Sequence, residues 1–190
     1  MSTLDTTHSV SFFHRPIKNK WPDREPLSLF QVYQMVHTNR YRPETTALRA
    51  IDDAQEQRKY KDENLDYVTP SGQFSYCNDQ SLLQHSGLIC MDLDELTNVD
   101  DMKQRLLDDP MFETMFMFRS PRGCGLKWWV EIDLTRCDHR TWFKAIRNYL
   151  MTTYGLTVKQ VDASCANPSR ACFLSYDPEA YLKPELIEFF

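Results

Sequence analysis

The chain has 190 residues, of which 42% are hydrophobic and 26% are charged. This composition fits one compact domain or a core with a smaller lobe, and it excludes fibrous, low-complexity and wholly disordered proteins. The net charge of −5 argues against a protein that coats DNA without sequence preference, but it allows a local basic groove. The sequence has no apolar run of roughly 18 residues and no recognisable signal peptide. We therefore expect a cytoplasmic protein without a membrane partner.

The first part of the chain, residues 1–86, is polar and favours helices. Apolar residues recur at helical spacing over 27–38, and a second helix is predicted over 44–61. Residues 69–76 predict a turn that leads into a strand, because Pro-Ser-Gly precedes an aromatic run. We expect residues 1–86 to form a small α+β lobe, either separate or integrated with the rest into one domain.

The second part, residues 87–190, alternates strands and helices. Strands are predicted over 87–94, 113–120, 126–134 and 170–177, and helices over 98–109 and 139–154. This β-α-β-β-α-β order predicts an α+β fold with a ferredoxin-like (RRM-like) core. In that topology the third strand lies between the first two and antiparallel to both, and the fourth flanks the first. The end of the first strand, the turn before the third and the loop before the fourth should then meet at one edge.

Two carboxylates end the first predicted strand. Asp92 and Asp94 are two residues apart, so within a strand their side chains point to the same face. Such a pair repels itself unless a cation or a proton lies between the two groups, and hard oxygen ligands suit Mg²⁺ or Mn²⁺. The alternative is a strand end that simply emerges into solvent.

The turn between the second and third strands carries positive charge and glycine. Ser120 offers a hydroxyl, Gly123 and Gly125 allow backbone N–H groups to approach an anion, and Arg122 and Lys127 are basic. The alternative is an ordinary hairpin that needs glycine for its backbone conformation. The spacing does not match a Walker A loop.

A third carboxylate, Asp162, and a further basic residue, Arg170, lie in the loop before the last strand. If Asp162 lies near the aspartate pair, the three carboxylates could form a two-metal site for phosphoryl displacement. Arg170 could bind a phosphate or the sugar. Taken singly, the two residues also fit a capping aspartate and a surface arginine.

Other residues exclude some chemistries or predict packing. Trp128 and Trp129 should point to opposite faces of the third strand, with at most one of them in the core. The six cysteines lack zinc-finger spacing, so we expect reduced thiols, with a zinc site assembled from distant residues as the alternative. The five histidines form no His-x-His pair, which counts against a rolling-circle nicking endonuclease.

Three stretches together resemble the archaeo-eukaryotic primase (primase-polymerase) superfamily. They are GLICMDLDEL, MFRSPRGCGLKWWVEI and VDASCANPSRACFLSYDP. The chain is most similar to the branch found at the N-terminus of mobile-element proteins that carry a virulence-associated-E-type helicase. The R…K…PSG-x-F pattern of that branch's N-terminal lobe is matched by Arg49, Lys61 and the Pro70–Phe74 stretch. Lys127 stands where the superfamily's usual nucleotide-phosphate histidine would be.

The resemblance implies a DNA-directed primase or polymerase that acts in the replication of DNA or of a mobile element. Asp92, Asp94 and Asp162 would hold two Mg²⁺ or Mn²⁺ ions. Ser120, Arg122, Gly123, Gly125, Lys127 and Arg170 would bind the nucleoside triphosphate, and Arg49, Lys61 and Ser71 the nucleic acid. The implied partners are a single-stranded DNA template and a helicase domain or protein. Two rival hypotheses are a catalytically weak or inactive module of the same fold that binds nucleic acid or recruits a helicase, and a nucleotide cyclase.

Overall fold

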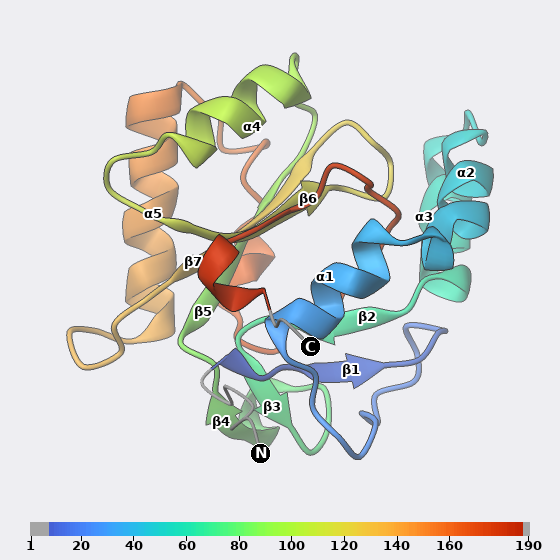
Figure 1. Ribbon diagram of the computed structural model, residues 1–190, viewed down its shortest axis with the longest axis horizontal. Coiled ribbons are helices and arrows are strands. Elements are labelled where there is room, and N and C mark those ends of the chain that lie inside the picture. Colours follow the sequence, from blue (N-terminus) through green and yellow to red (C-terminus); the bar gives the residue numbers. More distant parts are fainter. Residues whose placement is uncertain (1–7, 188–190) are drawn as a thin grey trace.

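The computed structural model describes residues 8–187 of the chain, and these form an α+β fold (Figure 1), as predicted. The strands are β1 (Ser11–Phe13), β2 (Tyr67–Thr69), β3 (Gly72–Phe74), β4 (Leu82–His85), β5 (Leu88–Leu93), β6 (Thr114–Arg119), β7 (Leu126–Glu131), β8 (Cys172–Phe173) and β9 (Tyr181–Leu182). The helices are α1 (Leu29–His37), α2 (Arg42–Arg49), α3 (Ala54–Asn64), α4 (Val99–Leu107) and α5 (His139–Tyr154). Short 3₁₀ turns cover Asn39–Tyr41, Asp79–Ser81, Ala163–Ala166 and Pro184–Leu186. No helix within the described part is both long and apolar enough to cross a membrane.

The central sheet has the strand order β5-β7-β6-β9. Strand β7 is antiparallel to both β5 and β6, so β5 and β6 run parallel with β7 between them. This confirms the arrangement predicted for the first three strands of the core. The C-terminal end of β5 consequently lies beside the start of β7, where the 120–127 hairpin enters the sheet.

The two faces of this sheet are covered by different parts of the chain. On one face Trp128 packs in a cluster that includes residues of α4 and α5, and on the other Trp129 packs with residues of α1 and β1. Figure 1 shows α4 and α5 together on one side and α1 and β1 on the other. The prediction that at most one tryptophan is buried is wrong, because neither face is open and both side chains are fully buried.

Local signals in the sequence account for most helix ends. The Asp138 side chain accepts a hydrogen bond from Thr141 N and begins α5, and Gly155 ends it in the left-handed conformation. The single helix predicted over 44–61 is two helices. Asp53 accepts hydrogen bonds from two backbone N–H groups of the next turn, so it starts α3 after a break.

The fourth strand of the predicted core lies elsewhere. Residues 160–162 instead run beside the end of β5, where Leu93 and Val161 form an isolated antiparallel bridge. Strand β8 pairs with β2 of the N-terminal part, and the other edge of the sheet is taken by β9, which pairs with β6. The predicted place of residues 170–177 beside β5 is therefore wrong. Segment 160–162 occupies the free edge of β5 near its C-terminal end, and β8 pairs instead with the free edge of β2.

Strand β8 makes a three-stranded sheet with β1 and β2, so the N-terminal lobe contains a strand from the C-terminal part. The division into 1–86 and 87–190 stays a prediction, and its first seven and last three residues lie outside the described part.

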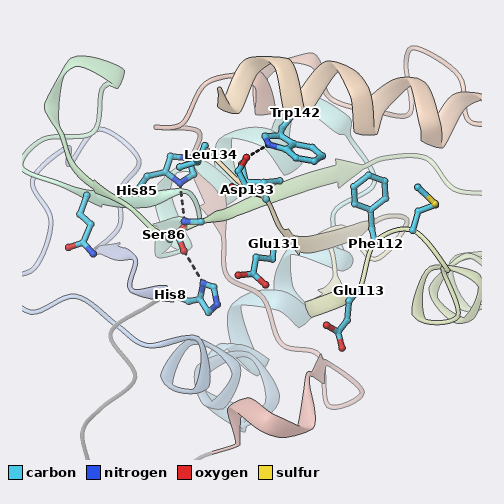
Figure 2. A pocket seen from close by; sticks show the side chains of 13 residues that line it. His8, His85, Ser86, Phe112, Glu113, Glu131, Asp133, Leu134 and Trp142 are labelled. Carbon is cyan, nitrogen blue, oxygen red and sulfur yellow. Dashed lines mark hydrogen bonds between the residues drawn. The ribbon is translucent and has the colours of Figure 1, made fainter. Parts of the chain in front are cut away.

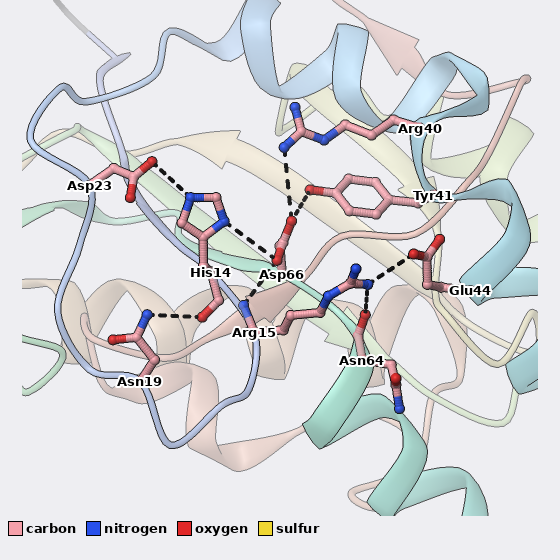
Figure 3. Close-up of polar contacts among 9 residues, drawn as sticks. All are labelled: His14, Arg15, Asn19, Asp23, Arg40, Tyr41, Glu44, Asn64 and Asp66. Atoms are coloured by element: carbon pink, nitrogen blue, oxygen red, sulfur yellow. Dashed lines mark hydrogen bonds and ion pairs between the residues drawn. The ribbon is translucent and has the colours of Figure 1, made fainter.

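A buried carboxylate fixes the N-terminal helices to this lobe (Figure 3). Asp66 accepts hydrogen bonds from the Tyr41 hydroxyl and from Arg15 N, both at 2.9 Å. The Arg15 guanidinium in turn donates to Glu44 at 2.9 Å and to the backbone oxygen of Asn64 at 2.8 Å. These contacts join α2 to the end of α3, and so they hold α3 in place beside the sheet.

Candidate functional site

The end of β5 is where the predicted site residues meet. Asp162 N donates to the backbone oxygen of Asp92 at 3.0 Å, and Asp94 N donates to that of Gln160 at 2.8 Å. Lys127 lies directly opposite Asp92 on β7. The predicted convergence of the aspartate pair, the hairpin and the 161–170 loop is therefore what the structure shows, even though β8 lies in another sheet.

Each of the three carboxylates is paired with a basic side chain of the hairpin or the last loop. The pairs are Asp92 with Lys127, Asp94 with Arg122 (3.4 Å) and Asp162 with Arg170 (2.6 Å). The site thus holds its own cations, and three negative charges are matched by three positive ones.

The first of these pairs is buried. The side chains of Asp92 and Lys127 are each 9% exposed, and Lys127 Nζ donates to Asp92 Oδ2. Burial acts to lower the pKa of Lys127, but the charge of Asp92 outweighs it and the pKa lies above its ordinary value. Asp92 Oδ1 is buried and has no hydrogen-bond partner. One oxygen of this carboxylate therefore remains available as an acceptor.

The other two carboxylates differ in their electrostatics. Burial and the nearby charge of Asp92 raise the pKa of Asp94. Burial also acts to raise the pKa of Asp162, but hydrogen bonds from Ser164 and the charge of Arg170 bring it below its usual value. The environment of Asp162 therefore favours its ionised form. The environment of Asp94 disfavours its ionised form, and an added positive charge nearby would stabilise that form.

Asp94 and Asp162 line a cleft of about 720 Å³, here called the carboxylate cleft. The opposite wall includes one face of α3, formed by Ala54, Gln57, Arg58 and Lys61 at helical spacing. The basic side chains that line the cleft are Lys20, Arg58, Lys61, Arg122 and Arg170. The acidic ones are Asp62, Asp94 and Asp162. Because positive charges outnumber negative ones, the cleft suits an anionic ligand such as a phosphate chain.

A small second cavity lies behind Asp92 and Lys127. Its volume is about 10 Å³, room for about one water molecule, and Cys90, Cys165 and Cys172 line it. These thiols are free, and burial raises the pKa of Cys165 to about 12. In the part of the chain that the structure describes, no three side chains of His, Cys, Asp or Glu are grouped to hold a metal ion, so nothing here supports the zinc alternative.

The donors fit a hard divalent ion in their chemistry, while their present positions serve ion pairing. In residues 8–187 no group of three or more His, Cys, Asp and Glu side chains is placed to hold a metal ion. The carboxylates instead point to their own basic partners. The free Oδ1 of Asp92 and the raised pKa of Asp94 are the two observations that favour an added cation.

Of the remaining predicted residues, some line the two cavities of the site and others do not. Lys61 lines the cleft, and Ser71 lines the small cavity beside Asp92. Arg49 lies behind the hairpin, where its guanidinium donates to the backbone oxygens of Pro121 (3.1 Å) and Ser120 (3.3 Å). Gly123 N donates to Ser120 O at 2.8 Å, so this amide is already occupied.

Ser120 and Gly125 form the base of the hairpin and do not line the cleft. The Ser120 hydroxyl is buried without a partner, and Ser120 N donates to Gly125 O at 2.9 Å.

Two basic residues that line the cleft, Arg58 and Lys20, were not among the predicted site residues. The spacing of residues 54, 57, 58 and 61 was the available indication for Arg58.

The hairpin depends on Gly125. A Cβ at this position would lie 2.1 Å from Leu93 O, a backbone atom at the end of β5. We expect Gly125→Ala to lower the free energy of unfolding by about 2–4 kcal/mol, because backbone must shift. Urea denaturation checks this. Gly155→Ala is the control: a Cβ there meets no atom within 4 Å, so only its left-handed conformation, about 1 kcal/mol, opposes it. Equal losses in both variants would contradict the steric argument.

A cleft of about 800 Å³ lies at the opposite end of strands β5 and β7 and contains none of the predicted residues (Figure 2). His8 Nδ1 lies 2.9 Å from Ser86 O, and Trp142 Nε1 donates to Asp133 O at 2.8 Å. His8 and His85 line it, but no lysine or arginine does among the residues that the structure describes. Its size alone does not make it the functional site.

A chain of hydrogen bonds leads from this second cleft to the 161–170 loop. Gly87 N donates to His85 Nδ1 (3.0 Å), His85 Nε2 lies 3.2 Å from His139 Nδ1, and His139 Nε2 lies 3.1 Å from Cys165 O. Burial and the charge of His139 lower the pKa of His85 to about 4. Burial also lowers the pKa of His139, so both imidazoles are neutral in the folded state near pH 7.

This neutral pair predicts a loss of stability in acid. The unfolded chain takes up a proton at His85 near pH 6.5, whereas the folded chain resists it down to about pH 4. Stability should therefore fall as the pH drops from 6.5 to 4. At pH 5 we expect a cost of about 1 kcal/mol after allowance for partial exposure, or about 2–4 °C in Tm. His85→Gln should lose less between pH 7 and pH 5, and an identical loss would contradict the assignment.

The fold and the site define the class of protein first: an α+β domain with a cleft lined by two ion pairs, Asp94 with Arg122 and Asp162 with Arg170. A family model described as BT4734-like, N-terminal domain, matches residues 59–182, which is more than half of the chain. The chain therefore belongs to the BT4734-like N-terminal domain family. The matched range contains Lys61, the three carboxylates, the hairpin and Arg170, but not Arg49. No curated protein and no solved structure matches the chain.

Proposed function

We propose that the chain is the catalytic domain of a primase-polymerase-like nucleotidyltransferase that adds nucleotides on a single-stranded DNA template. One observation carries the proposal. Asp92 and Asp94 at the end of β5 lie beside Asp162 of a distant loop, each next to a basic side chain, and Asp94 and Asp162 line the carboxylate cleft. The same arrangement agrees with the primase-polymerase resemblance of the sequence.

In this proposal the chain's own residues bind and orient the reactants. Arg122 and Arg170 are 34% and 44% exposed, so they are free to turn from their carboxylates toward the phosphates of a nucleoside triphosphate. Lys61 and Arg58, on the opposite wall, would contact the backbone of the template or primer strand. Asp92, Asp94 and Asp162 would hold Mg²⁺ or Mn²⁺. The divalent ion supplies positive charge that stabilises the pyrophosphate leaving group.

The test is incorporation of a labelled nucleotide on a single-stranded template, with and without a primer and with Mg²⁺ or Mn²⁺. Incorporation that depends on both the template and the divalent ion supports the proposal. Product formed from single nucleotides without a template would favour the cyclase alternative instead.

The buried pair of Asp92 and Lys127 favours a second candidate, a module of the same fold that binds nucleic acid or recruits a helicase without catalysis. A lysine that already neutralises the central carboxylate competes with any metal ion there. This candidate predicts single-strand binding that persists in EDTA, together with no incorporation under either metal ion.

A further inference from the structure

An exposed aromatic pair lies beside the carboxylate cleft. Trp21 is 68% exposed, and its ring meets the ring of the half-buried Tyr76 edge to face, with the centroids 5.0 Å apart. Lys20 precedes Trp21 and Cys77 follows Tyr76, and both of these neighbours line the cleft. The backbone oxygen of Lys20 accepts a hydrogen bond from Cys77 N at 2.9 Å, so the two segments run side by side. The aromatic pair therefore lies at the edge of the cleft.

The segment that carries Trp21 is held firmly. Ile17 N donates to the backbone oxygen of Asp62, on α3, at 2.7 Å. The Tyr67 hydroxyl, on β2, donates to the backbone oxygen of Asn19 at 2.6 Å, and Trp21 N donates to Asn19 Oδ1 at 3.2 Å. The exposure of Trp21 is thus not the result of a loose loop. A backbone fixed in this way has little freedom left to lose when a flat ligand stacks on the indole ring.

The charges of the cleft favour phosphate groups next to this aromatic pair. The two ion pairs of the cleft contribute no net charge. The other charged residues that line the cleft are Lys20, Arg58, Lys61 and Asp62. Three positive charges thus accompany one negative charge, and the excess attracts a polyanionic backbone. Lys20 brings this positive charge to the position next to Trp21.

A single-stranded nucleic acid fits both features, because its phosphates need positive charge and the flat faces of its bases stack on exposed aromatic rings. We infer that Trp21, supported by Tyr76, is a stacking platform for one base of a single strand that occupies the carboxylate cleft, with Lys20 bound to a neighbouring phosphate. The inference rests on the proposed function for the identity of its ligand. It applies equally to the catalytic domain and to the non-catalytic module, because both bind a single strand.

The test is the binding of a fluorescein-labelled oligothymidylate, measured by fluorescence anisotropy. Trp21→Ala should weaken binding by about 10- to 100-fold, the range expected for the loss of one stacked base. Trp21→Phe keeps an aromatic ring and should bind more tightly than Trp21→Ala. Leu83→Ala is the matched control: Leu83, on β4, is 69% exposed and does not line the cleft, so this variant should bind like the unaltered chain.

A duplex and the intrinsic fluorescence of tryptophan give two further readouts. A duplex hides the faces of its bases, so Trp21→Ala should not change the affinity for it. Trp128 and Trp129 are fully buried, and Trp142 lines the cleft at the opposite end of β5 and β7. Unlabelled oligothymidylate should therefore quench the fluorescence of Trp21 in the unaltered chain, and Trp21→Phe should show no quenching at saturation.

The outcomes separate the inference from the proposed function. Equal affinities of the unaltered chain and Trp21→Ala for oligothymidylate overturn the inference and leave the proposed function standing, because the strand still binds. Quenching that persists in Trp21→Phe also overturns it, since the tryptophan in contact with the strand is then another one. If the unaltered chain does not bind oligothymidylate, the proposed function fails and the inference fails with it.

Discussion

Asp92→Asn should abolish template-directed nucleotide incorporation, with a fall of at least about 1,000-fold. The substitution removes a carboxylate at the centre of the site and the one whose Oδ1 is a free buried acceptor. It should also lower the free energy of unfolding by about 3–5 kcal/mol, because Lys127 is left as an unpaired buried charge. The incorporation assay and urea denaturation measure the two effects.

A double variant separates chemistry from folding. Asp92→Asn combined with Lys127→Met leaves no unpaired charge, so most of the lost stability should return. Incorporation should stay absent, because the carboxylate is still missing. Activity that recovers together with stability would mean that Asp92 acts only as the structural partner of Lys127, and the proposed catalytic role would be wrong.

Arg122→Gln and Arg170→Gln should each weaken nucleoside triphosphate binding by about 10- to 100-fold, the range expected for a lost charge-assisted hydrogen bond. Their ion pairs are partly exposed, so each Tm should change by less than about 2 °C. Isothermal titration calorimetry with a non-hydrolysable deoxynucleoside triphosphate measures the affinity.

Arg105→Gln is the matched control, because Arg105 also has a half-exposed side chain paired with an aspartate, Asp101, but lies on α4 away from the cleft. Its affinity for the nucleotide should equal that of the unaltered chain. If all three variants bind equally well, the arginines of the site do not contact phosphate.

The arrangement around β5 could be predicted because it depends on the order of elements. Three strands of clear apolar character, joined by a helix and a short hairpin, leave few ways to wind the chain. That order was enough to bring Asp92, Asp94 and Lys127 to one edge. Segment 161–170 also lies there, but not because a strand that follows it pairs with β5, as predicted. Val161 forms a bridge with Leu93, and β8 then pairs with β2 in another sheet.

What could not be predicted depends on contacts between distant segments. Nothing in the residues around Trp128 and Trp129 tells that an N-terminal lobe covers the second face of the sheet. The ion pairs of the carboxylates also depend on contacts between distant segments, so they could not be predicted either. Arg122 and Arg170 could be recognised as basic residues near the site, but whether they face a carboxylate or an empty cleft is decided by side-chain geometry.

Strand β8 has a consequence for how the molecule can move and be divided. The chain leaves Asp162 at the edge of the central sheet, passes Arg170 and enters the sheet of β1 and β2 two residues later. Residues of this segment line the cleft, so the segment joins the two sheets beside the site, and the sheets can separate there only if β8 leaves β2. A fragment that starts at residue 87 would also leave β8 without its neighbour, so we expect it to be less stable than the whole chain.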